Sequence, residues 1–377
     1  MATESHAKYR VGVIGAGRKG TQHARAYALN PSTEVVAIAD NDQENLDLFR
    51  SRFDVPGYND YQDMLSKENI DIVAPILPVK PNPEVVLACA QSRVKAILCE
   101  KPLAASLEDA DRLVGICQSR GIKFGAGDMD RNLPQYWQVK ELIDSGELGE
   151  VLNITFMYGS GHEMSGGGCQ IFSLMRLFAG DADVAWTIGW VADDPVSDYD
   201  QGVAGYVRFV NGIEAFMQRK AGATREFEVR CSGGVIRNDG THLHISKAKE
   251  GNGRPGSMKL EEIDNLFDEP VHGSGFASHF DEHGWTWPGD RQVATVQSIV
   301  DALEQDIDPR ASGDNGRKVL EIAIGLRESH RRGHVPVRFP LEDRTLKIMP
   351  HDWRYLNKKT LWGREKYMPQ VLGQTKQ

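Results

Sequence analysis

The feature that most restricts the fold of this chain is a glycine-rich turn between an apolar run and a helical pattern. Residues 10–20 read RVGVIGAGRKG, and TQHARAYAL continues as a helix. In this order Gly15 permits a tight turn, Gly17 lets the backbone approach a pyrophosphate, and Gly20 lets the helix pack closely on the strand. The free N–H groups at the helix start would face the anion. Strand, turn and helix together predict a dinucleotide-binding unit, and an ordinary strand–helix turn is the alternative.

An acidic residue ends the next apolar run, EVVAIAD. Asp40 lies twenty residues after Gly20, which suits a carboxylate that binds the ribose hydroxyls of an adenine nucleotide. No arginine directly follows Asp40 to receive a 2′-phosphate, so NAD is predicted in preference to NADP. Arg18 and Lys19 in the glycine turn are further predicted cofactor contacts, and they keep NADP open as the weaker alternative.

Strand and helix patterns continue to alternate through the first half of the chain. We expect strands at 71–77 and 96–99 and helices at 82–92 and 106–121. This alternation predicts an α/β fold with a parallel, doubly wound sheet, in which ligands bind beyond the carboxyl ends of the strands. The run AILC leads to Glu100, Lys101 and Pro102 at this edge, where cofactor and substrate should meet.

From about residue 125 the sequence changes to short strand patterns separated by Gly, Asn and Asp turns. No helices of comparable length lie between these patterns, so a mostly antiparallel sheet is predicted. We expect strands at 151–159, 203–210, 213–219, 226–231, 242–246 and 335–341, loop over 250–290, and helices at about 290–305 and 317–333. The chain therefore divides into three predicted parts, which are residues 8–127, residues 128–342 and a C-terminal tail of residues 343–377.

The composition favours small-molecule partners. Among 377 residues, 53 acidic side chains outnumber 44 basic ones, which gives no electrostatic reason to bind nucleic acid or an anionic membrane. The apolar runs are far shorter than the roughly 20 residues of a membrane span, and the N-terminus lacks the apolar core of a signal peptide. Five cysteines form no CxxC pair and leave an odd number, so we expect no disulfide framework and a cytoplasmic location.

Taken together, these motifs resemble the Gfo/Idh/MocA family, which includes glucose–fructose oxidoreductase and inositol dehydrogenase. The resemblance covers roughly residues 9–342 and rests on VGVIGAGRKG, the strand end at Asp40, LCEKPLA, VKELIDSGELGEV and LEIAIGLRESHRRGHVPVRFPL. It implies an N-terminal Rossmann domain, followed by an α/β domain that binds substrate and contains a large, mostly antiparallel open sheet. This sheet usually serves as an oligomer interface, so a homo-oligomer, a dimer or a tetramer, is expected. The resemblance also implies NAD(P)-dependent hydride transfer to or from a carbinol carbon of a sugar, a sugar derivative or a cyclitol.

In that family the lysine of the EKP motif contacts both the nicotinamide and the reacting hydroxyl, and the preceding glutamate helps to hold the site. The matching residues here are Lys101, Glu100 and Pro102. General chemistry agrees, because a hydride leaves a carbinol carbon only as the hydroxyl proton leaves, and a desolvated lysine can share that proton. The alternative is a solvated pair of Glu100 and Lys101 at a strand end.

The chain departs from the family where a D-x-G-x-H-x-x-D signature is usual. Counted back from the helix end RLFAGD, Gln170 falls on the family's catalytic histidine and Ser173 on its second aspartate. A neutral glutamine forms hydrogen bonds but exchanges no proton near neutral pH. Gln170 and Ser173 share a helix face at i, i+3, so they are predicted to orient substrate hydroxyls. His162, just before this helix, is the candidate for a displaced general acid/base, and an ordinary loop histidine is the alternative.

A second departure lies in LPVKPN, where Asn82 replaces the family's histidine. Prolines are dense in this stretch and stiffen it, and Pro78 and Asn82 are expected to line the nicotinamide pocket. The histidines of HLH (242–244) and HFDEH (279–283) have suggestive spacing for a metal, but solvated or packed histidines are the commoner reading of such pairs. The chemistry needs no metal, and none is predicted.

The sequence therefore predicts an NAD-dependent dehydrogenase that acts on a carbohydrate or cyclitol, with Lys101, His162 and Gln170 as the catalytic set. The lost histidine leaves a second enzyme class open, in which transient oxidation by bound NAD accompanies glycosidic cleavage. A non-catalytic nucleotide-binding protein is the third alternative. The retained EKP motif argues against it, because a pure binding module would not need a lysine there.

Overall fold

The structure is a computed structural model, and it describes residues 8–127, 130–158, 168–219, 226–239, 242–249, 260–263 and 291–350. These residues form two compact units. Within the described ranges, the first unit takes residues 8–132, 291–317 and 350, and the second takes residues 133–263 and 318–349. Helix α8 (Arg291–Gln305) therefore belongs with the first unit, although the second unit's strands up to β14 precede it in the sequence.

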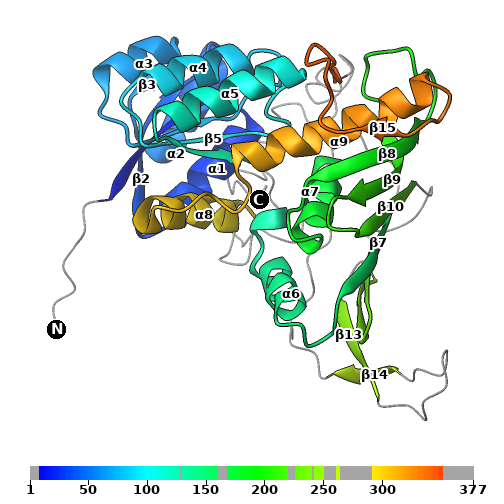
Figure 1. Cartoon of the computed structure of the whole chain (residues 1–377). Coiled ribbons are helices and arrows are strands. Elements are labelled where there is room, and N and C mark those ends of the chain that lie inside the picture. The colour runs from blue at the N-terminus through cyan, green and yellow to red at the C-terminus, as the bar shows by residue number, and fades with distance from the viewer. Residues whose placement is uncertain are drawn as a thin grey trace, which may run out of the picture. The chain divides into compact units, whose positions relative to one another are not determined.

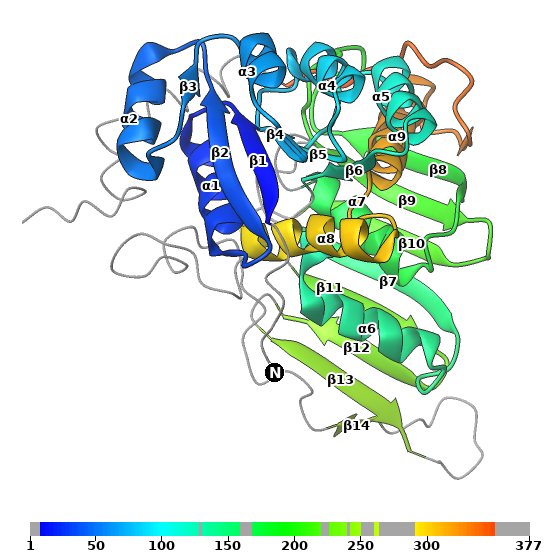
Figure 2. The ribbon, with the colours of Figure 1, turned by 90° about the vertical axis from the view of Figure 1, so that its left-hand side faces the viewer.

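The first unit is built on a sheet of six strands in the order β3-β2-β1-β4-β5-β6. Its elements are β1 (Tyr9–Ile14), α1 (Arg18–Leu29), β2 (Thr33–Ala39), α2 (Gln43–Phe53), β3 (Gly57–Tyr58), α3 (Tyr61–Lys67), β4 (Ile72–Pro75), α4 (Asn82–Gln91), β5 (Ala96–Cys99), α5 (Leu107–Ser119), β6 (Lys123–Ala126), the short η1 (Asp130–Asn132) and α8. Every strand pair is parallel. Helices α1 and α8 lie side by side on one face, and α4 and α5 lie on the other (Figure 1, Figure 2). The predicted doubly wound sheet is confirmed, and its order reverses between β1 and β4, where such sheets bind ligands.

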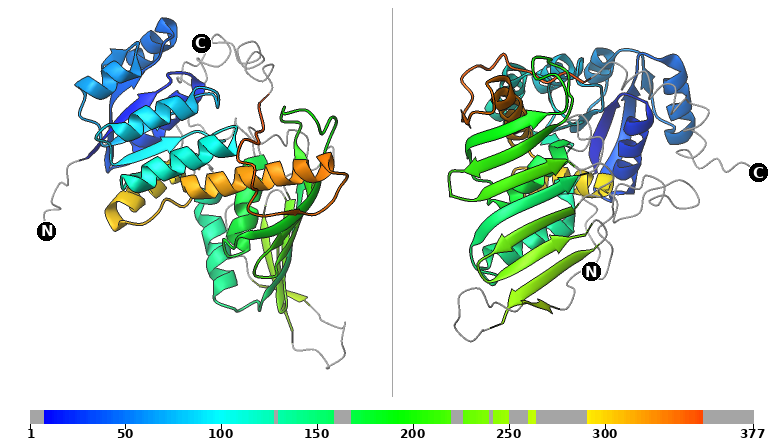
Figure 3. Two further views of the ribbon diagram at one scale, coloured as in Figure 1. Left: turned by 45° about the horizontal axis from the view of Figure 1, so that its top comes forward. Right: turned by 90° about the vertical axis from the view of Figure 1, so that its right-hand side faces the viewer.

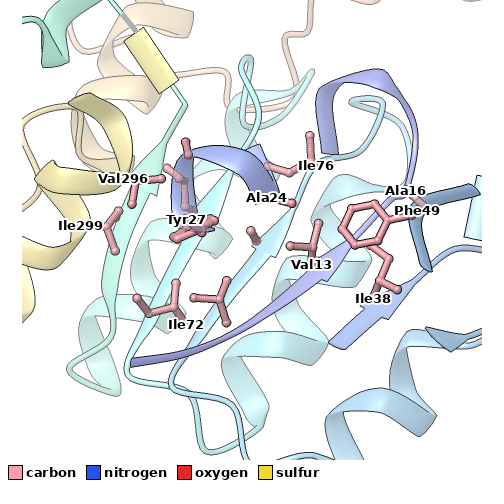
Figure 4. Close-up of a cluster of buried hydrophobic side chains, with 14 of the residues drawn as sticks. Val13, Ala16, Ala24, Tyr27, Ile38, Phe49, Ile72, Ile76, Val296 and Ile299 are labelled. Carbon is pink, nitrogen blue, oxygen red and sulfur yellow. The ribbon is translucent and has the colours of Figure 1, made fainter. Parts of the chain in front are cut away.

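The core of this unit is a cluster of aliphatic and aromatic side chains between the sheet and helices α1, α2 and α8 (Figure 4). Val13 and Ile38 come from the strands, Tyr27 from α1, Phe49 from α2 and Ile299 from α8, and all are buried. Burial of each large apolar side chain contributes about 1.5–3 kcal/mol. Because both faces of the sheet are covered by helices, the central strands read as continuous β-branched runs.

Two helix starts follow the capping chemistry that the sequence encodes. Ser106 precedes α5, and its Oγ accepts a hydrogen bond from the backbone N–H of Asp109 at 3.1 Å, as the capping-box spacing predicts. Asp42 precedes α2 and accepts hydrogen bonds from the backbone N–H groups of Glu44 and Asn45. Asp42 is therefore engaged as a helix cap just beyond the end of β2. Among the described helices, none combines the length and the apolar character that a membrane crossing requires.

The second unit contains a sheet of nine strands in the order β14-β13-β12-β11-β7-β10-β9-β8-β15. Its elements are α6 (Pro134–Asp144), β7 (Val151–Tyr158), α7 (Cys169–Phe178), β8 (Val184–Val191), β9 (Val203–Phe209), β10 (Glu214–Arg219), β11 (Glu226–Cys231), β12 (Gly234–Asn238), β13 (Leu243–Ala248), β14 (Leu260–Ile263), most of α9 (Gly313–Arg331) and β15 (Val337–Arg338). Every neighbouring pair is antiparallel except β7 and β10, which are parallel. The predicted mostly antiparallel sheet is confirmed.

Three strands of this sheet, β8, β12 and β14, are absent from the sequence prediction. The loop expected over 250–290 is wrong at Leu260–Ile263, which pairs antiparallel with β13. This acidic stretch has a weak strand pattern of its own, and the hydrogen bonds to β13 make it a strand. Strand β12 returns from β11 through a tight hairpin in which Cys231 lies opposite Gly234.

The two faces of the nine-stranded sheet differ in their cover. Helices α6 and α7 lie on one face (Figure 3). Leu326 of α9 packs so closely against two strand glycines that a Cβ at Gly189 or Gly205 would lie 2.7 Å from its side chain. The other face carries no helix of the described chain, and Figure 3 (right) looks onto it. Trp186 stacks on Tyr206 there, with 5.2 Å between the ring centres.

Candidate functional site

The glycine turn between β1 and α1 has the geometry of an anion-binding helix start. Gly15 has a φ of 102°, and a Cβ there would lie 2.6 Å from the carbonyl oxygen of Ile76. A Cβ at Gly20 would lie 1.7 Å from the carbonyl oxygen of Gly15, so both positions require glycine. Among the described residues, no heavy atom beyond the neighbouring backbone lies within 4 Å of the Cβ position at Gly17, and no side chain caps α1. The first N–H groups of α1 are therefore available to a pyrophosphate that approaches at Gly17.

Asp40 ties the end of β2 to this turn. Its carboxylate accepts hydrogen bonds from the backbone N–H of Ala16 at 2.6 Å and of Asp42 at 2.8 Å. A carboxylate has about four lone-pair sites, so Asp40 keeps acceptor capacity for ribose hydroxyls. Lys19 is half-buried in the first turn of α1, and the side chain of Arg18 lies outside the described part of the structure. These features fit the adenosine and pyrophosphate portions of NAD.

The EKP segment begins at the end of β5, at the same edge of the sheet as the glycine turn. The backbone N–H of Glu100 donates to the carbonyl oxygen of Pro75 at 3.4 Å. Glu100 is only 8% exposed, so it is buried rather than solvated. Its Oε1 lies 3.2 Å from Nε2 of His23 on α1, and its Oε2 accepts from the backbone N–H of Lys101 at 3.2 Å. Lys101 is half-buried, and the peptide bond between Lys101 and Pro102 is cis.

The charges around Glu100 keep it ionised. Burial by itself raises the pKa of this carboxyl group. The hydrogen bond from His23 lowers the pKa, and so do the positive charges of Lys19 and Lys101. Together these interactions outweigh burial and hold the pKa of Glu100 well below its usual range. An ionised carboxylate only accepts hydrogen bonds, so His23 donates to it through Nε2.

Asn82 and Pro78 hold different places in the loop after β4. Asn82 is buried at the start of α4, and its Nδ2 donates to the carbonyl oxygen of Leu103 at 2.7 Å. Its Oδ1 has no hydrogen-bond partner among the described residues. Burial raises the pKa of the Cys99 thiol, at the end of β5, to about 12. Asn82 therefore braces the EKP segment through Leu103. Pro78 is exposed in the loop between β4 and α4.

Two residues that support this site are absent from the sequence prediction, His23 and Gly127. His23 follows Gly20 by three residues, so it lies on the helix face that packs closely on the sheet, and this spacing is a signal in the sequence. Gly127 follows β6 with a φ of 23°. A Cβ there would lie 2.7 Å from the carbonyl oxygen of Cys99 and 3.1 Å from Cα of Glu100. Gly127 thus lets the backbone of the EKP segment pack directly against the end of β6.

The candidate substrate residues of the second unit lie on α7, a helix whose ten residues are all buried. Gln170 lies in its first turn and Ser173 one turn later, so the two share a face as predicted. Oε1 of Gln170 is buried and has no hydrogen-bond partner among the described residues. His162, the candidate displaced acid/base, falls in the stretch before α7 that lies outside the described residues.

The other histidine motif in the described chain forms a charged cluster at the end of the second sheet. His244 on β13 lies between Glu262 at 2.9 Å and Asp239 at 3.0 Å. These two carboxylates raise the pKa of His244 above its ordinary value. His242 precedes it along the chain, with 6.4 Å between the two ring centres. The histidines at 279 and 283 lie outside the described residues.

Comparisons with known proteins show which family the first domain resembles. Residues 9–127 match the model GFO_IDH_MocA, described as an oxidoreductase family with an NAD-binding Rossmann fold. The myo-inositol 2-dehydrogenase of Thermotoga maritima is 31% identical over 149 residues, which are 39% of this chain and 44% of that protein. This match thus spans less than half the length of that relative. The inositol 2-dehydrogenase of Rhizobium meliloti is 23% identical over 333 residues, which are 83% of this chain and 94% of that protein.

The similarity of fold extends beyond the matched domain. A levoglucosan dehydrogenase in complex with NADH and L-sorbose has a TM-score of 0.72 and 19% identity, over 89% of this chain and 100% of that chain. At this identity the likeness concerns the fold of both units. The glycine turn and the EKP segment lie within the matched residues, and there they meet the geometric demands of a dinucleotide. Residues 9–127 of this chain are therefore similar to the Gfo/Idh/MocA oxidoreductases, a family described by its NAD-binding Rossmann fold.

Proposed function

We propose that this protein is an NAD-dependent oxidoreductase that transfers a hydride to or from a carbinol carbon of a sugar, a sugar derivative or a cyclitol. The observation that carries the proposal is the EKP segment, whose lysine is held at the same sheet edge as the glycine turn by a buried, ionised Glu100. The relatives named above are inositol and levoglucosan dehydrogenases, which supports this substrate class. NAD is the proposed cofactor and NADP the weaker alternative, because Asp40 lies at the end of β2.

Each described residue has a distinct part in the proposed reaction. Bound NAD supplies the nicotinamide ring that accepts or gives the hydride. The helix start at Gly17 receives the pyrophosphate, and Asp40 receives the ribose hydroxyls. Lys101 shares the proton of the reacting hydroxyl through Nζ, while Glu100 fixes the backbone from which that side chain extends.

The second unit contributes substrate recognition in this proposal. Gln170 and Ser173 orient hydroxyl groups of the substrate, and the buried Oε1 of Gln170 gains a partner when a hydroxyl donates to it. Glutamine carries no proton, so Lys101 performs the acid/base work, with His162 as the candidate second group. Pro78 and Asn82 complete the nicotinamide side of the pocket, where Asn82 acts by bracing the EKP segment.

A glycoside-cleaving enzyme that uses transient oxidation is the second candidate, and Gln170 in place of an acid/base residue favours it. In that case NAD is reduced and reoxidised within one turnover, so no NADH accumulates. A non-catalytic nucleotide-binding protein has less support, because Glu100 would not need to hold Lys101 from inside the domain.

The open face of the nine-stranded sheet supports a proposed homo-oligomer, a dimer or a tetramer. Its stacked Trp186 and Tyr206 offer the aromatic area that is enriched in interfaces between subunits. All five cysteines are free and buried, which supports the proposed location in a reducing cytoplasm.

A substrate panel with two readouts tests the function. Inositols, monosaccharides, sugar acids and glycosides are incubated with NAD or NADP while NADH absorbance and cleavage products are recorded. Steady NADH release supports the dehydrogenase, and cleavage without net NADH supports transient oxidation. We expect Lys101→Met to lower turnover about 10²–10⁴-fold, far more than it lowers NAD affinity, while Lys67→Met on the exposed side of α3 leaves turnover unchanged. Full turnover in Lys101→Met would refute the proton relay.

A further inference from the structure

His23 is a fully buried imidazole with one described hydrogen-bond partner. Its Nε2 lies 3.2 Å from Oε1 of Glu100, a residue 77 positions away along the chain. Its Nδ1 has no hydrogen-bond partner among the described residues. The tautomer with hydrogen on Nε2 satisfies the contact to Glu100 and leaves Nδ1 as an acceptor, whereas a hydrogen on Nδ1 would be a buried donor without an acceptor. Within the described chain, the imidazole is thus directed at the carboxylate.

The carboxylate of Glu100 contacts both His23 and the backbone of Lys101, and so connects the two residues. One oxygen faces His23 on α1, and the other accepts from the backbone N–H of Lys101. The surrounding backbone has little freedom, because Gly127 packs against Cα of Glu100 and Asn82 holds the carbonyl oxygen of Leu103. A change in the Glu100 side chain therefore acts on the peptide plane from which Lys101 extends.

We propose that His23 is a positioning residue for Lys101 and acts through Glu100. The proposal rests on the proposed function, since it assigns His23 a part in the reaction of Lys101. Helix α1 begins with the glycine turn that receives the pyrophosphate, and its second turn holds the EKP carboxylate. The same helix thus positions both the cofactor and the amine of Lys101. This links the position of Lys101 to that of the nicotinamide.

Variants of His23 separate positioning from simple packing. His23→Leu fills the same space without a donor, and His23→Gln keeps an amide donor at the end of the side chain. Tyr27→Phe is the matched control, because Tyr27 is buried one turn further along α1 and its hydroxyl has no partner among the described residues. We expect His23→Leu to lower kcat about 10–100-fold, the range for a hydrogen bond to a charged group. KM for NAD stays unchanged, His23→Gln recovers most of kcat, and Tyr27→Phe matches the wild type.

The pH profile gives a second signature. Glu100 is faced by His23 and Lys19 from α1 and by Lys101 from its own segment. Without the His23 donor, burial acts on Glu100 with less opposition, so the acid limb of kcat moves to higher pH in His23→Leu. In His23→Gln the limb stays near its wild-type position. A purely structural role for His23 would lower kcat at every pH by the same factor.

An activity-independent measurement keeps this test distinct from the proposed function. Trace acetylation of the full-length protein with acetic anhydride is followed by mass spectrometry, and labelling of Lys101 is compared with that of exposed Lys67. Release of Lys101 in His23→Leu should raise its relative labelling about tenfold. Glu100→Gln should cause the same change without disturbing α1, and the double variant should add nothing further.

The outcomes distinguish a failure of the proposed function from a failure of the link between His23 and Lys101. If no substrate of the panel is turned over by the wild type but Lys101 labelling responds to His23→Leu and Glu100→Gln alike, the proposed function fails and the positional link stands. Equal labelling of Lys101 in the wild type, His23→Leu and Glu100→Gln would overturn the link. A His23→Gln enzyme as impaired as His23→Leu would overturn it too, since the donor alone would then not account for the effect.

Discussion

The candidate residues of the two units differ in how they are held. In the first unit the carboxylates at the sheet edge have fixed partners, as Asp40 has in the backbone N–H of Ala16 and Glu100 has in His23. In the second unit Gln170 lies on a helix buried on every side, and its Oε1 has no partner among the described residues.

This contrast indicates a division of work. A site whose charged groups already have fixed partners is preorganised, so a ligand meets carboxylates that need not reorient. An unsatisfied buried acceptor costs stability until a ligand donates to it. The first unit therefore has the properties of a preformed cofactor site. The second has those of a site in which the substrate supplies the missing hydrogen-bond donor.

Gly20→Ala should have the largest effect, because it disrupts the glycine turn between β1 and α1 that forms the cofactor site. A Cβ at this position would lie 1.7 Å from the carbonyl oxygen of Gly15, and backbone cannot yield as a side chain can. Overpacking of this kind costs about 1–3 kcal/mol of stability. The opened turn should also lower NAD affinity about 100-fold, on the order of 3 kcal/mol. Urea unfolding and NAD titration by intrinsic fluorescence measure the two effects.

Gly17→Ala is the matched control for that prediction. Gly17 has a φ of −68°, and its Cβ position is open, so the unfolding free energy of the unliganded protein should change by less than about 1 kcal/mol. NAD affinity should nevertheless fall, because the added methyl group occupies the space through which the pyrophosphate approaches. If Gly17→Ala bound NAD as tightly as the wild type, the pyrophosphate would not bind at this turn.

Asn82 and Gln170 each carry a buried amide, one in each unit, and their replacement should affect stability differently. Asn82→Leu removes the donor to the buried carbonyl oxygen of Leu103 and should cost about 1–3 kcal/mol of stability. Gln170→Met removes a carbonyl oxygen that has no described partner, so the unfolding free energy should stay the same or rise by about 1 kcal/mol. KM for the substrate should rise about tenfold in Gln170→Met, since one buried hydrogen bond to a hydroxyl is lost. Equal destabilisation by the two changes would remove the distinction between a preformed and a substrate-completed site.

The same contrast explains what could be predicted from the sequence. The first sheet rests on local patterns, such as the glycine turn and the capping spacing at Ser106, and these are visible within a few residues. Strand β14 becomes a strand only through its pairing with β13, and the short hairpin at Cys231 gives no separate signal for β12. Long-range pairing of this kind leaves little trace in a single sequence.

The candidate site divides along the same line. Glu100 and Lys101 follow a buried strand, so their place at the sheet edge could be predicted from neighbouring residues. The contact between His23 and Glu100 joins residues 77 positions apart, and the approach of Gly127 to Cys99 joins two different strand ends. Such pairs exist only once the parallel sheet has brought the strand ends together. The place of the EKP segment at the sheet edge therefore follows from the local sequence, and the contacts that support it follow from the fold.

The two units should also respond to pH with opposite signs. Glu100 has a lowered pKa, so its contribution to stability is present above the ordinary glutamate value near 4.3 and is lost as pH falls. His244 has a raised pKa because of Glu262 and Asp239. Its contribution is fully present below the ordinary histidine pKa of about 6.5 and is lost as pH rises through the raised value.

The alkaline effect should be the smallest of these, because the His244 side chain is 38% exposed and solvent screens its ion pairs. It should be confined to the edge of the second sheet, where Ser246 on β13 pairs with Glu262 on β14. Amide hydrogen exchange, corrected for the intrinsic pH dependence, should show lower protection of β14 at pH 9 than at pH 6, with β5 unchanged. His244→Gln removes the titrating group, so protection of β14 should then be the same at both pH values. Loss of protection in β5 as well would mean that the change is global, and the charged cluster at His244 would not be its cause.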